Sequence, residues 1–265
     1  MESEGEGTLL PGTITHELAR FPNTGRFLAG RLRHDMSEVE KRILEDAIYE
    51  VAVLDKPKRI LEHGKVYDHS TMLIEGFVLR TIDGEENRYG VSFHVPGDFV
   101  DLHCFALKRL DHNIDTIGEV KVGYVPHKKL REIMADHPHL ARLLWFSTLL
   151  DAAMHREWVM KLEQLTTARR LAHIFSEIWC RLRMVELGDE TGFETPLTQS
   201  DLADMCGATS IHVNRALKEL REKDIAQFER GRVTIRDKRQ LEEFGCFQAD
   251  YLYGEGAIHL REGYA

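Results

Sequence analysis

The sequence contains little cysteine and little proline, and its cysteines follow no known pattern. Its 265 residues include seven prolines and four cysteines, which are Cys104, Cys180, Cys206 and Cys246. Because these cysteines lie far apart and form no C-x-x-C pair, their spacing indicates neither a disulfide framework nor a zinc ribbon. We therefore expect free thiols in a reducing cytoplasm.

The sequence also lacks a long apolar run and an excess of positive charge. The most apolar stretch, residues 140–154, contains Arg142 and Asp151 and falls short of the roughly 20 apolar residues that span a bilayer. The first residues lack the basic and apolar segments of a secretory leader, so we expect a cytoplasmic protein. With 44 acidic and 35 basic residues, the net charge is −9. Binding to nucleic acid therefore needs a local basic patch.

The residues that are present predict an α+β chain of about two domains. Residues 1–25 are acidic and aperiodic, which predicts a flexible N-terminal arm. Ser37 and Glu40 form an S-x-x-E capping box, which is typical of a helix start. Alternating apolar residues over 72–80, 91–95 and 120–124 are separated by turn signals at Gly84, Gly97 and Gly118. Such short strands favour an antiparallel β-barrel of the jelly-roll kind, and we assign residues 26–136 to this sensor domain.

The pattern becomes helical again after the barrel. Residues 138–164 are apolar almost all round in their first half, which predicts a helix that is buried on two sides. One face repeats at steps of three and four, as in a heptad seam: Trp145, Thr148, Ala152, His155, Val159 and Leu162. We predict that residues 137–165 pair with a second copy of the chain. Burial within one chain is the alternative.

The most informative segment, residues 197–220, follows a predicted helix over 167–185 and a polar loop over 186–196. Thr198 is placed to cap a short helix, Gly207 allows a sharp turn, and Thr209 or Ser210 can cap a second helix. Two short helices joined in this way form a helix-turn-helix.

The second helix has a polar and basic outer face. Residues 209–223 contain four basic and two acidic residues, a local charge of +2. Arginine can bind guanine and asparagine can bind adenine, each through two hydrogen bonds. Residues 225–235 read as a two-stranded wing with arginines at its tip. The predicted DNA contacts are Gln199, Ser210, Ile211, Asn214, Arg215, Lys218, Arg230 and Arg232. We assign residues 166–240 to a winged helix-turn-helix that binds double-stranded DNA, and residues 241–265 to a tail.

This order of barrel, long helix and winged helix-turn-helix resembles the CRP/FNR family of bacterial transcription regulators. Residues 96–99, Pro-Gly-Asp-Phe, are similar to the start of that family's effector-binding cassette. The resemblance covers residues 30–240. It implies a cyclic-nucleotide-binding-like sensor domain and a homodimer on a two-fold symmetric operator. It also implies RNA polymerase as a partner, and a regulator rather than an enzyme.

The sequence departs from the family pattern at several positions. Cyclic-nucleotide binders continue the cassette with Gly-Glu and later carry Arg followed by Ser or Thr, whereas this chain has Asp101 and then residues 111–113, Asp-His-Asn. A phosphate buried without a permanent cation is costly, so we expect no control by cyclic AMP. Iron–sulfur members use clustered N-terminal cysteines, but the first cysteine here is Cys104. On the recognition helix Arg215 matches the family's guanine-reading arginine, while Ile211 replaces a glutamate.

The signal that the sensor domain detects stays open. The candidate effector-pocket residues are Asp101, His103, His112, Asn113, His155 and Arg156. We expect no metal and no cofactor, because the barrel contains no tight H-x-H or H-x-x-x-H pair. A metal or haem held by barrel histidines is one alternative. A cupin-type enzyme fused to a DNA-binding domain is another, but it needs an H-x-H that residues 55–126 do not contain.

Overall fold

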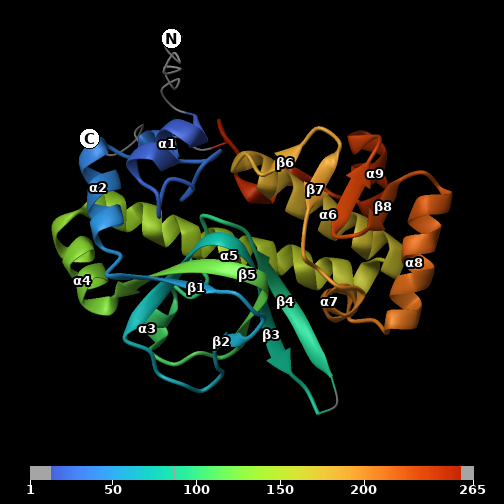
Figure 1. The fold of residues 1–265 in the computed structure, drawn as a ribbon, viewed down its shortest axis with the longest axis horizontal. Helices are drawn as coiled ribbons and strands as arrows, with labels where there is room; N and C mark the ends of the chain where they lie inside the picture. The colour runs from blue at the N-terminus through green and yellow to red at the C-terminus, as the bar shows by residue number, and fades with distance from the viewer. Residues whose placement is uncertain (1–12, 86, 258–265) are drawn as a thin grey trace, which may run out of the picture.

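The computed structural model describes residues 13–85 and 87–257, which form a sheet domain and a smaller, mainly helical domain (Figure 1). The helices are α1 (Ile14–Arg20), α2 (Glu38–Asp46), α3 (Cys104–Leu107), α4 (His127–Asp136), α5 (Pro138–Gln164), α6 (Thr167–Met184), α7 (Gln199–Cys206), α8 (Ser210–Glu222) and α9 (Lys238–Gly245). The strands are β1 (Glu50–Leu54), β2 (Arg59–Leu61), β3 (His69–Asp83), β4 (Arg88–His94), β5 (Asn113–Pro126), β6 (Gly188–Asp189), β7 (Gly192–Glu194), β8 (Ala226–Glu229) and β9 (Arg232–Ile235).

The sensor domain is an antiparallel sheet of five strands. Its order is β1-β5-β3-β4, and β2 also pairs with β5. The predicted α+β jelly-roll class is confirmed, although the paired strands of the described residues do not close into a barrel. Gly118, predicted as a turn between strands, instead lies inside β5 with φ +73°. It sits opposite Gly76 (φ +83°), where the β3–β5 register shifts, so the two glycines permit a bulge rather than a chain reversal.

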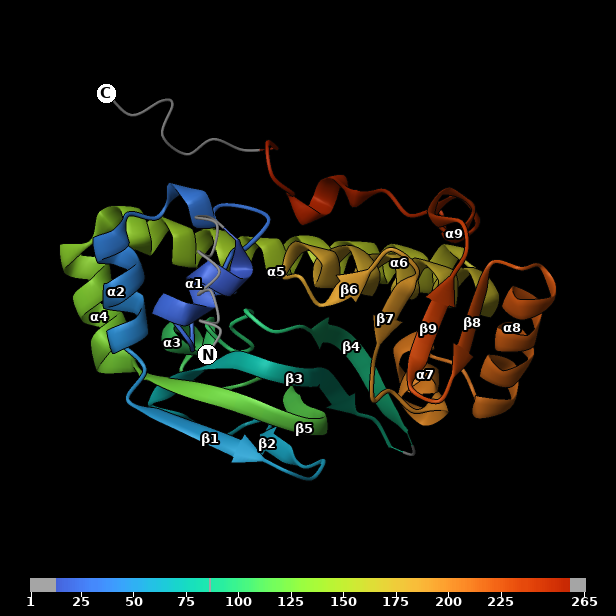
Figure 2. The same cartoon turned by 45° about the horizontal axis from the view of Figure 1, so that its top comes forward.

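The long helix α5 joins the two domains. Its bounds match the predicted helix, and Figure 2 shows it running beside the sheet domain towards α6. The buried face of α5 contributes Leu140, Leu143 and Leu144 to a core shared with the N-terminal helices and the sheet. Further along, Trp158 joins a second core that contains Phe93 of β4 and α6. The same helix therefore packs on both domains. No helix of the described ranges has both the length and the apolar character that a bilayer crossing needs.

The predicted N-terminal arm is wrong from residue 13 onwards. Thr13 caps α1, and Phe21 is 1% exposed. The buried carboxylate of Glu17 accepts hydrogen bonds of 2.8 Å from both Arg33 and Lys41. These long-range ion pairs hold the segment against α2, and local periodicity does not reveal them. Residues 1–12 of the predicted arm lie outside the described residues.

The predicted loop and tail also contain folded elements. The loop over 186–196 forms the hairpin β6–β7, because Phe193 is buried and β7 pairs with β9 of the wing. The tail over 241–265 begins inside α9. Leu241 packs in the second core, and Leu252 packs against α5 residues. Residues 258–265 lie outside the described part of the chain.

Candidate nucleic-acid interface and sensor site

The helix-turn-helix predicted from the sequence is confirmed in the structure. The Thr198 hydroxyl accepts from the Asp201 backbone N–H at 3.2 Å, and the Asp201 carboxylate accepts from the Thr198 N–H at 2.9 Å. Gly207 ends α7 with φ +56°, a left-handed conformation that glycine adopts without strain. Thr209 then caps α8 by accepting from the His212 N–H at 3.4 Å. Both caps pre-organise the start of their helix.

Helix α8 has one buried face and one exposed face. Val213, Ala216 and Leu220 point into the core of the domain. Ile211 is 64% exposed on the opposite side. The other exposed predicted contacts on this helix are Ser210, Asn214, Arg215 and Lys218, and Gln199 is exposed at the start of α7. The helix lies at the outer edge of the molecule (Figure 1), so its polar face is open to a partner.

The wing carries two arginines in different states. Arg230 is exposed at the turn between β8 and β9, with φ +51°. Arg232 instead donates to Asp189 at 2.7 Å and to Glu194 at 2.8 Å, which ties the wing to the hairpin β6–β7. The guanidinium of Arg232 is thus already paired with two carboxylates, whereas that of Arg230 is open to a phosphate.

The sensor sheet touches the helix-turn-helix directly. Arg88, at the start of β4, donates to Asp204 at 2.8 Å and to Asp201 at 2.9 Å, both on α7. Gly90 lies against Met205, where an added Cβ would come within 3.1 Å of the methionine side chain. An open cleft of about 620 Å³ separates the tip of this strand hairpin from the beginning of α8. The sequence predicted none of these contacts between domains.

A buried ionic cluster forms a second link between the domains. Arg181 of α6 is 1% exposed, donates to Asp98 at 2.5 Å, and donates to the Phe93 carbonyl at 2.7 Å. Burial opposes ionisation of Asp98, but Arg181 and His94 outweigh it and hold the pKa of this carboxyl at about 2. Glu177, also buried, accepts from the Tyr251 hydroxyl at 2.7 Å. The cassette residue Asp98 therefore anchors the sensor domain to the DNA-binding domain.

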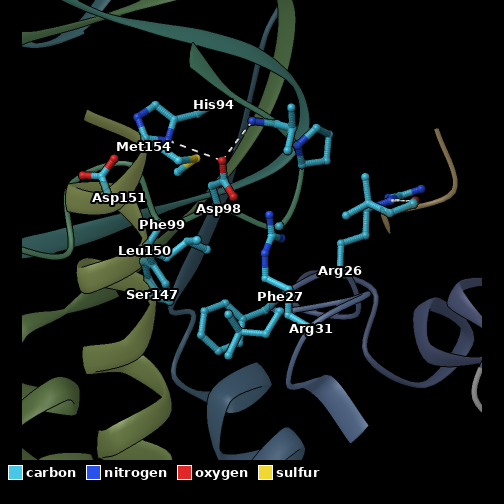
Figure 3. Close-up of a pocket in the computed structure, with 15 residues that line it drawn as sticks. Arg26, Phe27, Arg31, His94, Asp98, Phe99, Ser147, Leu150, Asp151 and Met154 are labelled. Atoms are coloured by element: carbon cyan, nitrogen blue, oxygen red, sulfur yellow. Dashed lines mark hydrogen bonds and ion pairs between the residues drawn. The ribbon is translucent and has the colours of Figure 1, made fainter. Parts of the chain in front are cut away.

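The cassette itself borders a small cavity (Figure 3). This cavity, of about 30 Å³, lies between residues 94–99 and α5. Its lining includes Arg31, His94, Asp98 and Asp151. A space of this size holds about one water molecule. In this structure the cassette serves a packed interface rather than an open ligand pocket.

The structure brings together only some of the predicted effector residues. His103 and His112 lie side by side, with ring centres 5.1 Å apart. Burial, followed by the nearby Arg80, lowers the pKa of His103 to about 4 and that of His112 to about 3, so both rings are neutral at pH 7. Arg156 is exposed on α5, and the His155 ring is 3.2 Å from the Asp151 carbonyl one turn earlier.

Two other predicted effector residues have structural partners. Asp101 is fully buried and accepts from the Thr71 N–H at 2.5 Å. Burial raises the pKa of Asp101 to about 7. Asn113 accepts from the His63 N–H at 2.8 Å through its side-chain oxygen. Both side chains therefore satisfy neighbouring backbone donors of the sensor domain.

Arg80 is a residue that sequence reasoning missed. It is 3% exposed on β3 and donates to Asp151 of α5 at 2.7 Å and to the Val100 carbonyl at 2.8 Å. The region therefore does contain a permanent cation, although Asp151 pairs with it. The sequence does contain a signal for it. Arg80 continues the alternating series 72–80, which places its side chain on the same face of the strand as the apolar residues of that series.

The predicted seam of α5 lies on its open face. Trp145 is 63% exposed, Val159 is 65% exposed and Leu162 is 37% exposed, while Ala152 is exposed and Thr148 and His155 are half-buried. Leu149, which was not assigned to the seam, is 51% exposed on the same side. Such a row of large apolar side chains on a surface is typical of a contact site.

Lys161 is a buried cation without a hydrogen-bond partner. It is fully buried, and its Nζ lies 3.2 Å from the ring centre of Trp158 and contacts no acceptor among the described residues. Burial lowers the pKa of Lys161 to about 7. A buried ammonium without a hydrogen-bond acceptor is costly. The attraction of Glu177 and the contact with the Trp158 ring do not compensate for this cost, since the pKa stays lowered, so Lys161 destabilises the fold near neutral pH.

Replacing Lys161 with methionine is expected to raise the free energy of unfolding at pH 7 by about 1–2 kcal/mol. Between pH 7 and about 10, the unfolded wild-type chain keeps a lysine proton that the folded chain has released. Wild-type stability therefore rises with pH in this window, and the variant lacks this rise. Urea unfolding at several pH values measures both effects, and Lys129→Met, at an exposed site on α4, is the control. An unchanged pH slope in Lys161→Met would contradict the prediction.

These features define a class of protein: a DNA-binding transcription regulator with a jelly-roll sensor domain. Residues 169–244 match the family model described as the Crp-like helix-turn-helix domain. The chain is 27% identical over 194 residues to the transcriptional activator protein FnrL of Cereibacter sphaeroides, covering 70% of this chain and 77% of that protein. It is 26% identical over 161 residues to a probable transcriptional activator of Rhizobium leguminosarum bv. viciae, covering 60% of this chain and 65% of that protein.

The fold is also similar to that of solved regulators. The structure of FixK2 from Bradyrhizobium japonicum superimposes with a TM-score of 0.66 at 21% identity, covering 74% of this chain and 96% of that one. The domain match, the relatives and the fold agree with one another. They support a transcription regulator of the CRP/FNR type, with a Crp-like helix-turn-helix domain over residues 169–244 and relatives named as transcriptional activators.

Proposed function

We propose that the protein binds a two-fold symmetric operator as a homodimer, with one α8 helix per half-site. The observation that carries this proposal is the exposed polar face of α8. Both α7 and α8 begin with a side-chain cap, and Arg230 of the wing flanks the face. Each chain has one such helix in its described part. The exposed face of α5 supports pairing, which would set two recognition helices about 34 Å apart.

The residue types on α8 suggest how the operator is read. Arg215 is suited to guanine, Asn214 to adenine, and Ile211 to the methyl group of thymine. Lys218 and Arg230 are suited to phosphates, which contribute affinity without sequence preference. We infer that the half-site differs from the family consensus at the position that a glutamate usually reads.

Replacing Arg215 with alanine is expected to cost about 1–3 kcal/mol and to relax specificity at one base pair. Replacing Lys218 with alanine is expected to weaken binding to all sequences alike and to reduce the salt slope by about one. Selection from a random DNA library, followed by titration at several salt concentrations, measures both effects. Lys129→Ala is the matched control, because Lys129 is also an exposed, ion-paired lysine but lies on α4. Unchanged base preferences in Arg215→Ala would contradict the proposal.

We further propose that operator binding does not require cyclic AMP. The Arg80 guanidinium already forms an ion pair with Asp151. The carboxyl of Asp101 lies buried where cyclic-nucleotide binders of the family carry the groups that hold the nucleotide. The same titration, repeated with cyclic AMP, is expected to give an unchanged affinity, and a tenfold gain would contradict this part. Both curated relatives are named as activators. We therefore propose that the bound protein acts on RNA polymerase in the cytoplasm.

A further inference from the structure

We propose that His103, Asp111 and His112 bind one divalent first-row transition-metal ion at the edge of the sensor sheet. One imidazole nitrogen from each histidine and one carboxylate oxygen lie within 4.8 Å of one another. Two nitrogen donors and one oxygen donor suit zinc, iron(II), cobalt or nickel, whereas magnesium and calcium prefer oxygen alone. Three protein ligands also leave a coordination position open.

The chain folds back on itself to bring these ligands together. His103 precedes the short helix α3, and His112 directly precedes β5. Lys108 ends α3 in a left-handed conformation with φ +62°, which reverses the chain between the two histidines. The ligands therefore belong to one ten-residue segment, although their spacing matches none of the short metal motifs.

The two histidines have unsatisfied buried atoms. The Nε2 atoms of His103 and His112 are buried and have no hydrogen-bond partner among the described residues. Buried polar atoms are rarely left unpaired, and a bound ion would satisfy both. His112 is 5% exposed, and its Nδ1 lies 2.6 Å from an oxygen of Asp111.

Charges around the cluster also permit a cation. Asp111 contributes a carboxylate whose side chain is 78% exposed, so an ion can enter from solvent. Arg80 is a like charge that acts on both histidines, and its ion pair with Asp151 at 2.7 Å offsets its repulsion. His103 also lines the apolar groove between α3 and α5 that contains Trp145. A bound ion would therefore tie the start of α3 to the start of β5.

Cobalt titration of the full-length protein, after removal of metals with a chelator, tests the proposal. We expect one ion per chain, with visible absorption bands of a nitrogen- and oxygen-ligated cobalt centre that zinc abolishes by competition. His112→Ala and His103→Ala are each expected to weaken binding on the order of tenfold or more. His63→Ala is the control, because His63 is an exposed histidine of the same domain outside the cluster.

Asp111→Asn keeps the test valid if the buried histidine variants do not fold, because Asp111 is on the surface. It is expected to weaken cobalt binding while leaving the circular dichroism spectrum unchanged. Absence of stoichiometric binding to the wild type would overturn the proposal. Unchanged affinity in both Asp111→Asn and a folded histidine variant would do the same. No DNA enters this measurement, so its outcome is independent of the proposed operator binding.

Discussion

Replacing Arg181 with methionine is expected to lower the free energy of unfolding by about 3–5 kcal/mol. The guanidinium of this residue is buried between the carboxylates of Asp98 and Glu177 and also donates to the Phe93 carbonyl. Methionine fills a similar volume but leaves both carboxylates without their permanent cation. An uncompensated buried charge costs far more than a surface ion pair of the same length contributes.

The effect should be specific to the link between the domains. Arg181 lies on α6, whereas Asp98 and Phe93 belong to the sensor domain. In calorimetry at fixed protein concentration, we therefore expect the variant to unfold earlier and in two separable transitions. Arg183→Met is the control, since Arg183 is an exposed arginine of the same helix whose guanidinium lies 5.9 Å from the ring centre of Trp179. If Arg181→Met lowers the free energy of unfolding no more than Arg183→Met does, the assigned role of Arg181 is wrong.

A second substitution distinguishes charge from packing. In the double variant Arg181→Met with Asp98→Asn, one of the unpaired carboxylates becomes neutral. We expect this variant to recover part of the lost stability, because an amide costs less to bury than a carboxylate. If the double variant is less stable than the single variant, the loss is due to packing and not to unpaired charge.

Local signals account for the parts of the fold that the sequence predicted well. Each helix cap joins two residues that are three positions apart, as at Ser37, Thr198 and Thr209. A side chain and a backbone amide at that distance meet in almost any context, so the helix starts could be read directly. The α5 helix was equally clear, since its period extends over many turns.

Contacts between distant residues account for the parts that the sequence did not predict. Glu17 orders the supposed arm through Arg33 and Lys41, and Arg88 docks the sensor sheet on Asp204 more than 100 positions later. No periodic pattern encodes such pairs. The sequence named His103 and His112 as candidates but did not predict their grouping with Asp111, because a left-handed turn and not a fixed short spacing brings these residues together.

Introducing glutamate at Ala152 is expected to convert the proposed dimer to a monomer and to lower operator affinity by about 10²–10⁴-fold. Ala152 lies midway along the open face of α5, between the exposed Leu149 and Val159. In a two-fold pair of parallel helices each seam residue meets its own copy, so one substitution places two carboxylates face to face in an apolar contact. Loss of the second half-site contact then removes the gain that comes from binding two linked sites.

Sedimentation and DNA titration together check this expectation. The variant should sediment as a monomer at micromolar concentration and bind a single half-site as well as the wild type does, since α8 is unchanged. Ala135→Glu is the matched control, because Ala135 is an exposed alanine on α4 and receives the same added charge. If Ala152→Glu remains dimeric with unchanged operator affinity, the apolar face of α5 is not the surface through which the chains pair.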